Sequence, residues 1–177
     1  MRQLAVSAIG RDRPGIVAAV ARSLLDHGLN IEDSQMGILR GHFTMVLIVS
    51  GAEDVEVEGL RGDLEATARE LGLEAMSVNE VDALAAPDLG EPTHIVTVYG
   101  ADHPGIVHAI ASALAERGAN ITDLQTRLVD EEGESLYVMM LEVAVDGEAA
   151  EVEEALQAAG GEQGVEVTVR ELESDAL

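Results

Sequence analysis

A repeat inside the chain constrains its fold more strongly than any other feature of the sequence. Residues 10–35 align without gaps on residues 100–125, and 14 of the 26 aligned positions are identical. The offset between the copies is 90 residues, which is longer than the period of about 20–50 residues found in solenoid proteins. Each copy is long enough to form a small domain with its own core. The repeat therefore predicts two similar domains in tandem.

The segment between the two copies predicts a linker. Its hydrophobic periodicity lapses and two prolines, Pro87 and Pro92, appear, as is typical of connecting segments. The residues after the last predicted strand are expected to form a frayed acidic tail. The predicted organisation is a first domain at 1–81, a linker at 82–92, a second domain at 93–172 and a tail at 173–177.

Each copy begins with a pattern that predicts a strand, a turn and a helix. Apolar, β-favouring residues cover 4–9 in the first copy and 93–99 in the second, and a glycine follows each run. Beyond the next proline, apolar residues recur at the three- and four-residue spacing of an amphipathic helix. Gly28 and Gly118 mark the predicted ends of these helices.

The remainder of each copy predicts a hairpin, a second helix and a last strand. In the first copy, strands from Asn30 and over 43–50 meet at a turn around 40–42. The second copy carries four more residues there, which predict a polar loop over 130–135. A helical apolar pattern follows in both copies, and strict alternation over 165–169 predicts a half-buried strand. The order β-α-β-β-α-β predicts an α+β, ferredoxin-like fold, with a four-stranded antiparallel sheet and two helices on one face.

The charge of the chain excludes several classes of partner. It has 34 acidic residues against 10 basic ones, all of them Arg, and a net charge of −24. Phosphate backbones and anionic membranes repel such a chain, and an aromatic content of 2% leaves little surface for stacking bases. We therefore expect no direct contact with nucleic acid or membranes. We interpret the acidity as favouring solubility, or adaptation to a saline cytoplasm, in preference to an acidic partner-binding surface.

Other functional classes lack the residues that they need. The sequence has no Cys, and its five His residues are scattered, so no disulfide, thiolate site or metal site is predicted. It contains neither a Walker loop nor a nucleophile elbow. We expect no cofactor and no enzymatic activity. No signal peptide is apparent, and no run reaches the about 20 apolar residues of a membrane span, so a soluble, cytoplasmic protein is expected.

The densest motif is Asp-x-Pro-Gly-Ile-Val, which joins the first strand to the first helix in both copies, at 12–17 and 102–107. Its glycine allows close approach of another group, and a helix N-terminus offers free N–H groups and a partial positive charge. Such a turn can hold a carboxylate, as from an amino acid. The structural alternative, which turn chemistry alone favours, is a capped turn in which Asp12 or Asp102 accepts backbone N–H bonds.

An Asn-Ile pair follows the helix-ending glycine in each copy, at Asn30-Ile31 and Asn120-Ile121. Asn tolerates left-handed backbone, so one interpretation is a turn residue. Its amide can also donate to and accept from a bound amino acid. In the predicted plan the Asn lies at the edge of the sheet, close to the first turn of a partner copy.

Together, Asp-x-Pro-Gly-Ile-Val, a helix and then Gly-x-Asn-Ile resemble the ACT domain family, twice, over nearly the whole chain. The resemblance implies the ferredoxin-like fold, pairing of domains, and binding of amino acids or similar effectors at a domain interface. His103 stands where the first copy has Arg13, so the two copies are hypothesised to differ in the ligand charge that they prefer. The candidate ligand-binding residues that the resemblance implies are Asp12, Arg13, Pro14, Gly15, Ile16, Asn30, Ile31, Asp102, His103, Pro104, Gly105, Ile106, Asn120 and Ile121.

Among tandem members, the chain most resembles the glycine cleavage system transcriptional repressor group. That resemblance implies a regulatory protein that senses a small molecule, acts through a DNA-binding protein partner without touching DNA, and is able to form a homodimer. An alternative is a ligand-free interaction module, in which the doubled turn is structural. A third hypothesis is a fragment of an enzyme, because similar tandem domains precede catalytic domains in phosphoserine phosphatase-like and formyltetrahydrofolate deformylase-like proteins. No residues remain here for such a domain, so this hypothesis ranks last.

Overall fold

The computed structural model describes residues 1–82, 90–131 and 134–172. It divides into two compact units, Met1–Ala85 and Ala86–Leu177, each of which contains one copy of the repeat. The predicted tail and most of the predicted linker lie outside the described residues. Within the described ranges, no helix combines the length and hydrophobicity needed to cross a membrane.

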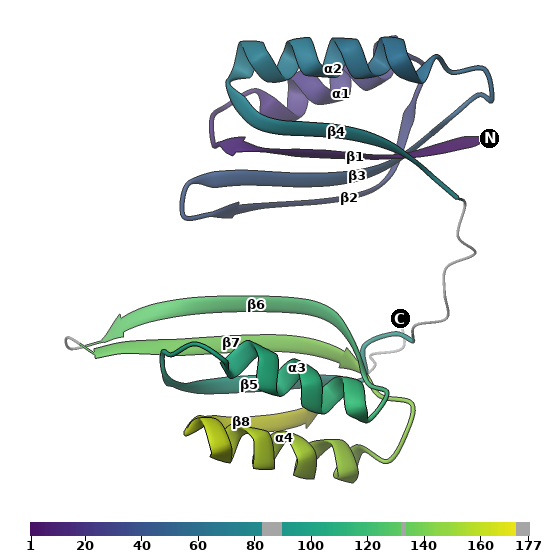
Figure 1. Ribbon diagram of the computed structural model, residues 1–177. Coiled ribbons are helices and arrows are strands. Elements are labelled where there is room, and N and C mark those ends of the chain that lie inside the picture. Colours follow the sequence, from purple (N-terminus) through teal and green to yellow (C-terminus); the bar gives the residue numbers. More distant parts are fainter. Residues whose placement is uncertain (83–89, 132–133, 173–177) are drawn as a thin grey trace. The chain divides into compact units, whose positions relative to one another are not determined.

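The first domain has the predicted order of elements. They are β1 (Arg2–Arg11), α1 (Ile16–Asp26), β2 (Asn30–Leu39), β3 (His42–Gly51), α2 (Val57–Leu71) and β4 (Leu73–Val81). Within residues 1–82, these strands form one antiparallel sheet in the order β2-β3-β1-β4. Both helices lie on the same face of this sheet (Figure 1). The domain is a ferredoxin-like α+β unit, as the sequence predicts.

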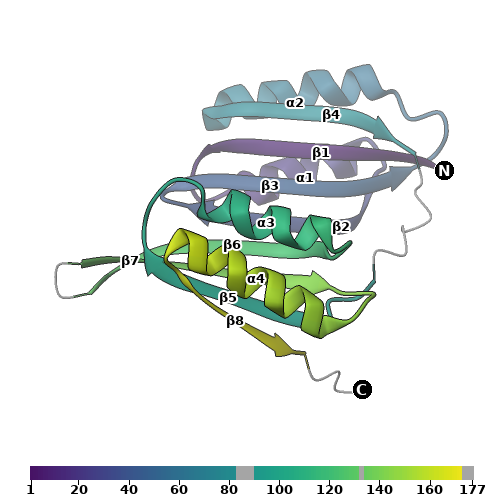
Figure 2. The same cartoon turned by 60° about the horizontal axis from the view of Figure 1, so that its bottom comes forward.

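The second domain repeats this plan. Its elements are β5 (His94–Ala101), α3 (Ile106–Glu116), β6 (Asn120–Glu131), β7 (Glu134–Ala144), α4 (Ala149–Gln163) and β8 (Glu166–Glu171). Among its described residues, the strands form one antiparallel sheet in the order β6-β7-β5-β8. Helices α3 and α4 cover one face of that sheet (Figure 2). The predicted fold class is therefore confirmed for both copies.

The core of each domain lies between the sheet and its helices. In β1, Leu4 and Val6 are fully buried, because alternate residues of a strand point to the same face. Helix α1 buries Ile16, Val20 and Leu24 against them, at the four-residue spacing that the sequence shows. Burial of each such aliphatic side chain contributes about 1.5–3 kcal/mol relative to exposure. The corresponding buried residues of α3 are Ile106, Ile110 and Leu114.

A glycine that is identical in the two copies lets the last strand approach the first. A Cβ atom built at Gly10 would lie 2.8 Å from the Cα of Leu73. A Cβ built at Gly100 would lie 2.9 Å from Cγ1 and 3.2 Å from the Cα of Val165. Side chains do not fit at such distances, so this position requires glycine in both domains.

The second hairpin differs from the prediction. The sequence predicts a polar loop over 130–135, but the strands continue into it: β6 runs to Glu131 and β7 starts at Glu134, with Asp130 opposite Ser135. In the first domain the tip is Arg40-Gly41, both with positive φ. The additional residues therefore lengthen the β-ribbon, because backbone pairing satisfies their N–H and C=O groups better than a loop does.

Candidate functional site

The Asp-x-Pro-Gly motif forms the turn between β1 and α1 and its counterpart between β5 and α3. Each helix starts one residue after the glycine, which is its N-cap and has a left-handed backbone, with φ 98° at Gly15 and φ 109° at Gly105. Ile16 and Ile106, the first helical residues, anchor the turns in the cores at 1% exposure each. The glycine is needed because residues with a Cβ rarely adopt this backbone.

The alternative in which aspartate caps the turn is not what the described residues show. Asp12 and Asp102 are exposed, and among the described residues no side chain makes a capping hydrogen bond to α1 or α3. Asp12 is held by its backbone instead, since its N–H donates to the carbonyl of Gly41 at 3.0 Å. The carbonyl of the N-cap glycine accepts the first helical hydrogen bond. Glycine has no side-chain oxygen, however, that could accept from the N–H groups of the first turn. The two turns therefore present free N–H donors and the positive end of a helix dipole to their surroundings.

The second predicted motif lies at the other end of each sheet. Asn30 opens β2 and pairs with Ser50, beside the start of β1, whereas the turn follows the end of β1 at Arg11. Asn120 likewise opens β6 and pairs with Ala144. Within one domain, the structure therefore does not bring the asparagine and the Asp-x-Pro-Gly turn together.

The interpretation of these asparagines as turn residues is wrong. Gly28 and Gly118 adopt the left-handed backbone after the helices, at φ 69° and 70°, and the asparagines are the first residues of extended strands. Asn30 is exposed and Asn120 is half-buried. Their neighbours differ too, because Ile31 is exposed whereas Ile121 packs against the core of its domain.

Arg13 and His103 are predicted ligand contacts. In the structure, each side chain reaches the C-terminal end of the second helix of its own domain. The Arg13 guanidinium lies over Gly72, the C-cap of α2, with Nη2 3.4 Å from where a Cβ of that glycine would be. His103 Nε2 lies 2.8 Å from the carbonyl oxygen of Gln163, the last residue of α4. A cation is favoured there because the last carbonyls of a helix carry partial negative charge.

The ring of His103 faces an acceptor at each nitrogen. Its Nδ1 lies 3.1 Å from the carbonyl oxygen of Pro104, in addition to the Nε2 contact with Gln163. These two carbonyls raise the pKa of His103 above its usual 6.5, burial opposes them, and the nearby Asp102 carboxylate adds to the rise. The last turn of α4 contains no basic residue of its own, whereas that of α2 contains Arg69.

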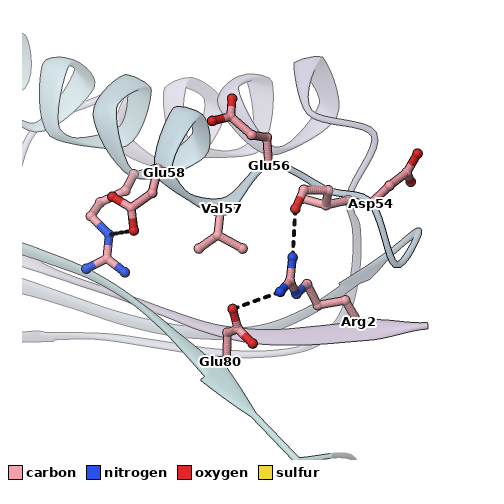
Figure 3. Close-up of a pocket in the computed structure, with 8 residues that line it drawn as sticks. Arg2, Asp54, Glu56, Val57, Glu58 and Glu80 are labelled. Carbon is pink, nitrogen blue, oxygen red and sulfur yellow. Dashed lines mark hydrogen bonds and ion pairs between the residues drawn. The ribbon is translucent and has the colours of Figure 1, made fainter.

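A separate pocket of about 370 Å³ lies in the first domain, where β3 leads into α2 (Figure 3). Arg2 spans it, donating to the carbonyl of Val55 at 2.9 Å and pairing with Glu80 at 3.1 Å. Arg2 and Arg61 are outnumbered by four lining carboxylates. Because the positive groups are already opposed by these carboxylates, we do not assign a ligand to this pocket. The lining residues are Arg2, Asp54, Val55, Glu56, Val57, Glu58, Arg61 and Glu80.

The described residues offer little support for a metal centre. Nowhere in 1–82, 90–131 or 134–172 do three or more His, Asp or Glu side chains gather in a way that could hold a metal ion. His27, for example, pairs with a single carboxylate, that of Asp63, at 2.8 Å. The turns are therefore the candidate site that the geometry supports best.

Comparison with known proteins agrees with the repeat and the fold. The glycine cleavage system transcriptional repressor of Escherichia coli is 28% identical over 160 residues, covering 88% of this chain and 82% of the repressor. A UPF0237 protein of Methanopyrus kandleri is 42% identical over 81 residues, covering 45% of this chain and 90% of that protein. Among solved structures, an unknown protein from Galdieria sulphuraria superimposes with a TM-score of 0.77 at 30% identity, covering 97% of this chain and 98% of that one.

The family assignment rests on a match to both copies. The model of the ACT domain matches residues 2–77 and again residues 93–170. These two ranges contain the turns, the helices that they start and nearly all of both sheets. The chain belongs to the ACT domain family, as a tandem pair of ACT domains.

Proposed function

We propose that this chain is a regulatory protein that binds a small carboxylate-bearing effector, an amino acid or a close analogue, at one or both of its Asp-x-Pro-Gly turns. Membership of the ACT domain family and similarity to a transcriptional repressor support a regulatory, ligand-sensing role. The observation that carries the proposal is the pair of helix starts at Ile16 and Ile106. Each has an N-cap glycine and, in the described structure, no side-chain cap.

The electrostatics of the chain favour a zwitterion over a simple anion. A net charge of −24 repels anions at long range. An amino acid with an uncharged side chain has no net charge, so this repulsion does not exclude it. Its carboxylate fits the free N–H groups at the start of the helix. The exposed carboxylate of Asp12 or Asp102, three residues before the N-cap glycine, is an acceptor for its ammonium group.

The asparagines enter this proposal only through a second domain. Because Asn30 and Asn120 lie at the far end of the sheet from the turn of their own domain, they reach an effector only where another domain presents them. A second copy of the chain in a homodimer is proposed to supply that domain. Substitution of Asn30 or Asn120 should weaken effector binding without altering the turn.

The output of the protein is proposed to be contact with a protein partner. One relative is named a transcriptional repressor, and the acidity of this chain disfavours direct contact with DNA. A DNA-binding protein is therefore the proposed partner, and the bound effector changes the affinity for it.

The first test is thermal unfolding of the whole chain with each common amino acid at millimolar concentration. An effector at about 100 times its Kd stabilises the folded state by about 2.7 kcal/mol. Both tyrosines, Tyr99 and Tyr137, lie in the second domain. Tyrosine fluorescence therefore reports the second domain alone, while circular dichroism reports both.

Matched glycine variants locate the site. Gly15→Ala and Gly28→Ala both force a Cβ onto left-handed backbone, and neither Cβ would meet an atom within 4 Å. The two substitutions should cost similar stability, about 1–2 kcal/mol. Gly15→Ala should also remove the effector-induced shift of the first domain, and Gly28→Ala should keep it. Equal loss or equal retention of the shift in both variants would contradict the proposed site.

A ligand-free interaction module is the second candidate. The edge strand β2 favours it, since Met36, Ile38 and Leu39 are 52%, 54% and 67% exposed. Exposed apolar groups on a strand edge mark a contact surface. If no effector shifts unfolding while a Met36→Lys/Ile38→Lys variant changes the oligomeric state or partner binding, this second function replaces the first.

A further inference from the structure

The ring of His103 is held in an arrangement that only its doubly protonated form satisfies. Its Nδ1 and Nε2 lie 3.1 and 2.8 Å from the carbonyl oxygens of Pro104 and Gln163. A carbonyl oxygen accepts hydrogen bonds and cannot donate them, and a neutral imidazole has only one N–H. Deprotonation therefore leaves a ring lone pair facing a carbonyl lone pair, and one of the two contacts must open.

The contact joins two separate parts of the second domain. His103 and Pro104 both belong to the Asp102–Gly105 turn, so the contact with Gln163, the last residue of α4, is the one that joins the turn to the helix. The Gln163 side chain also approaches the turn, because its Oε1 lies 3.3 Å from where a Cβ of Gly105 would be. The ring of His103 is thus the pin that joins the turn to the end of α4.

Titratable groups lie on several elements of the second domain next to this contact. Asp102, in the turn itself, acts on the ring through its charge and favours the protonated form. On β7, the pKa of Tyr137 is raised, mainly by burial and also by the negative charge of the Asp102 carboxylate. At the start of β8, the Glu166 carboxylate accepts a hydrogen bond from Tyr99. At the end of α4, Glu162 is exposed.

In the first domain, the residue at the corresponding place is an arginine, which does not titrate. The Arg13 guanidinium lies against Gly72 at the end of α2, as the ring of His103 does at the end of α4. Arginine stays protonated at every pH at which the protein is folded. The two domains therefore share an anchor between the turn and the second helix but differ in whether a proton can release it.

We propose that His103 is a positioning residue that fastens the Asp102–Gly105 turn to α4 most tightly while its ring carries two protons. In the first domain, Arg13 lies at the corresponding place and keeps its charge, so its turn should not respond to pH in this way. The sign follows from the direction of the His103 pKa, which is raised above 6.5 in the folded chain. The fastening is strongest below pH 6.5 and weakens as the pH rises through the folded value.

The test follows the turns of the whole chain by nuclear magnetic resonance between pH 5.5 and 8.5, without any effector. The proposal predicts that the imidazole of His103 titrates above its value in the urea-unfolded chain. It also predicts loss of protection at the amide of Ala109, which donates to the carbonyl of Gly105 at 2.9 Å. After correction for intrinsic exchange, that protection should fall several-fold, on the order of 2- to 10-fold. The amide of Ala19, bonded to Gly15 in the same way, should change less than twofold.

Reciprocal variants separate the pin from general loosening of the second domain. His103→Arg should abolish the pH dependence at Ala109, and Arg13→His should create one at Ala19. A His103 titration at or below the unfolded value in the unmodified chain overturns the proposal, as does equal protection of Ala109 across this range. No effector enters these measurements, so the result does not depend on the proposed function.

Discussion

The two domains have the same backbone plan but different charges around it. Where the backbone leaves no choice, the copies agree: Gly10 and Gly100 both allow the last strand to approach, and Gly15 and Gly105 both start a helix. Where the requirement is only a positive charge at a helix end, the copies differ in the residue that supplies it. The comparison teaches that steric requirements fix residue identity more tightly than electrostatic ones do.

A second difference concerns the pocket at the junction of β3 and α2. In the first domain, Arg2 is held there by Val55 and Glu80. In the second domain, the residue at the 90-residue offset from Arg2 is Pro92, which has no charge. The arginine that spans this pocket is therefore a feature of the first copy and not of the shared fold.

The largest effect on stability is expected from a methyl group at Gly10, where β4 approaches β1. Gly10→Ala places a Cβ 2.8 Å from the Cα of Leu73, and backbone cannot move aside as a side chain can. We expect a loss of about 2–3 kcal/mol from the free energy of unfolding of the first domain. The loss should appear in the ring resonances of Phe43, the single phenylalanine, during urea unfolding. A loss below about 0.5 kcal/mol would show that β4 does not approach β1 as described.

The next effect tests a packing difference between the copies. Gly160 of α4 is buried, and a Cβ there would lie 2.4 Å from Cγ2 of Val167; the first domain has Ala68 on α2 and Met76 on β4 at the corresponding places. Gly160→Ala should destabilise the second domain by about 1–3 kcal/mol. Adding Val167→Met should recover part of this loss, because an unbranched side chain can turn away.

Urea unfolding followed by tyrosine fluorescence measures the stability of the single and double variants, since both tyrosines lie in the second domain. Strictly additive losses in the double variant would mean that the two residues do not share the proposed contact.

Two exposed helix glycines should give smaller effects of opposite sign. A Cβ at Gly62 in α2 or at Gly161 in α4 would meet nothing within 4 Å. Replacement by alanine should stabilise the corresponding domain by about 0.5–1 kcal/mol, because alanine loses less backbone entropy in a helix. Calorimetry of each variant measures the shift. Destabilisation by either substitution would indicate a contact of that helix face with a partner surface.

The smallest effect distinguishes the domains by pH. The raised pKa of His103 predicts that the second domain loses stability as the pH rises above 6.5, in step with the titration of the ring. The first domain should not follow this titration, because Arg13 keeps its charge. Unfolding by urea at pH 5.5 and 8.5 with separate probes for the two domains gives the comparison. It is contradicted if the His103→Arg variant keeps the same pH dependence as the unmodified chain.

Much of the fold could be predicted from the sequence, because its signals are local and occur twice. The spacing of Ile16, Val20 and Leu24 predicts a helix by itself, and the alternation around Val167 predicts a half-buried strand. The repeat then supports these assignments, because the two copies show the same order of patterns. The hairpin of the second domain was predicted less well, since polar residues such as Asp130 are compatible with either a loop or an exposed strand.

For the candidate site, the sequence predicts the motif but not the arrangement of its side chains. Whether Asp12 caps its helix depends on how the turn is oriented, and the left-handed Gly15 that decides this is set by the complete strand–turn–helix unit. The destinations of Arg13 and His103 depend on the end of a helix that lies about 60 residues further along the chain. Such contacts are tertiary, so local spacing does not reveal them.

The central claim, that the doubled turns bind a carboxylate-bearing effector, is tested most directly by amide resonances of the whole chain titrated with individual amino acids, glycine and serine included. The account predicts that at least one amino acid shifts, in a saturable way, the N–H signals of Gly15, Ile16 and Val17 or those of Gly105, Ile106 and Val107. If every amino acid leaves both sets of signals unchanged at millimolar concentration, the turns are structural and the claim is wrong.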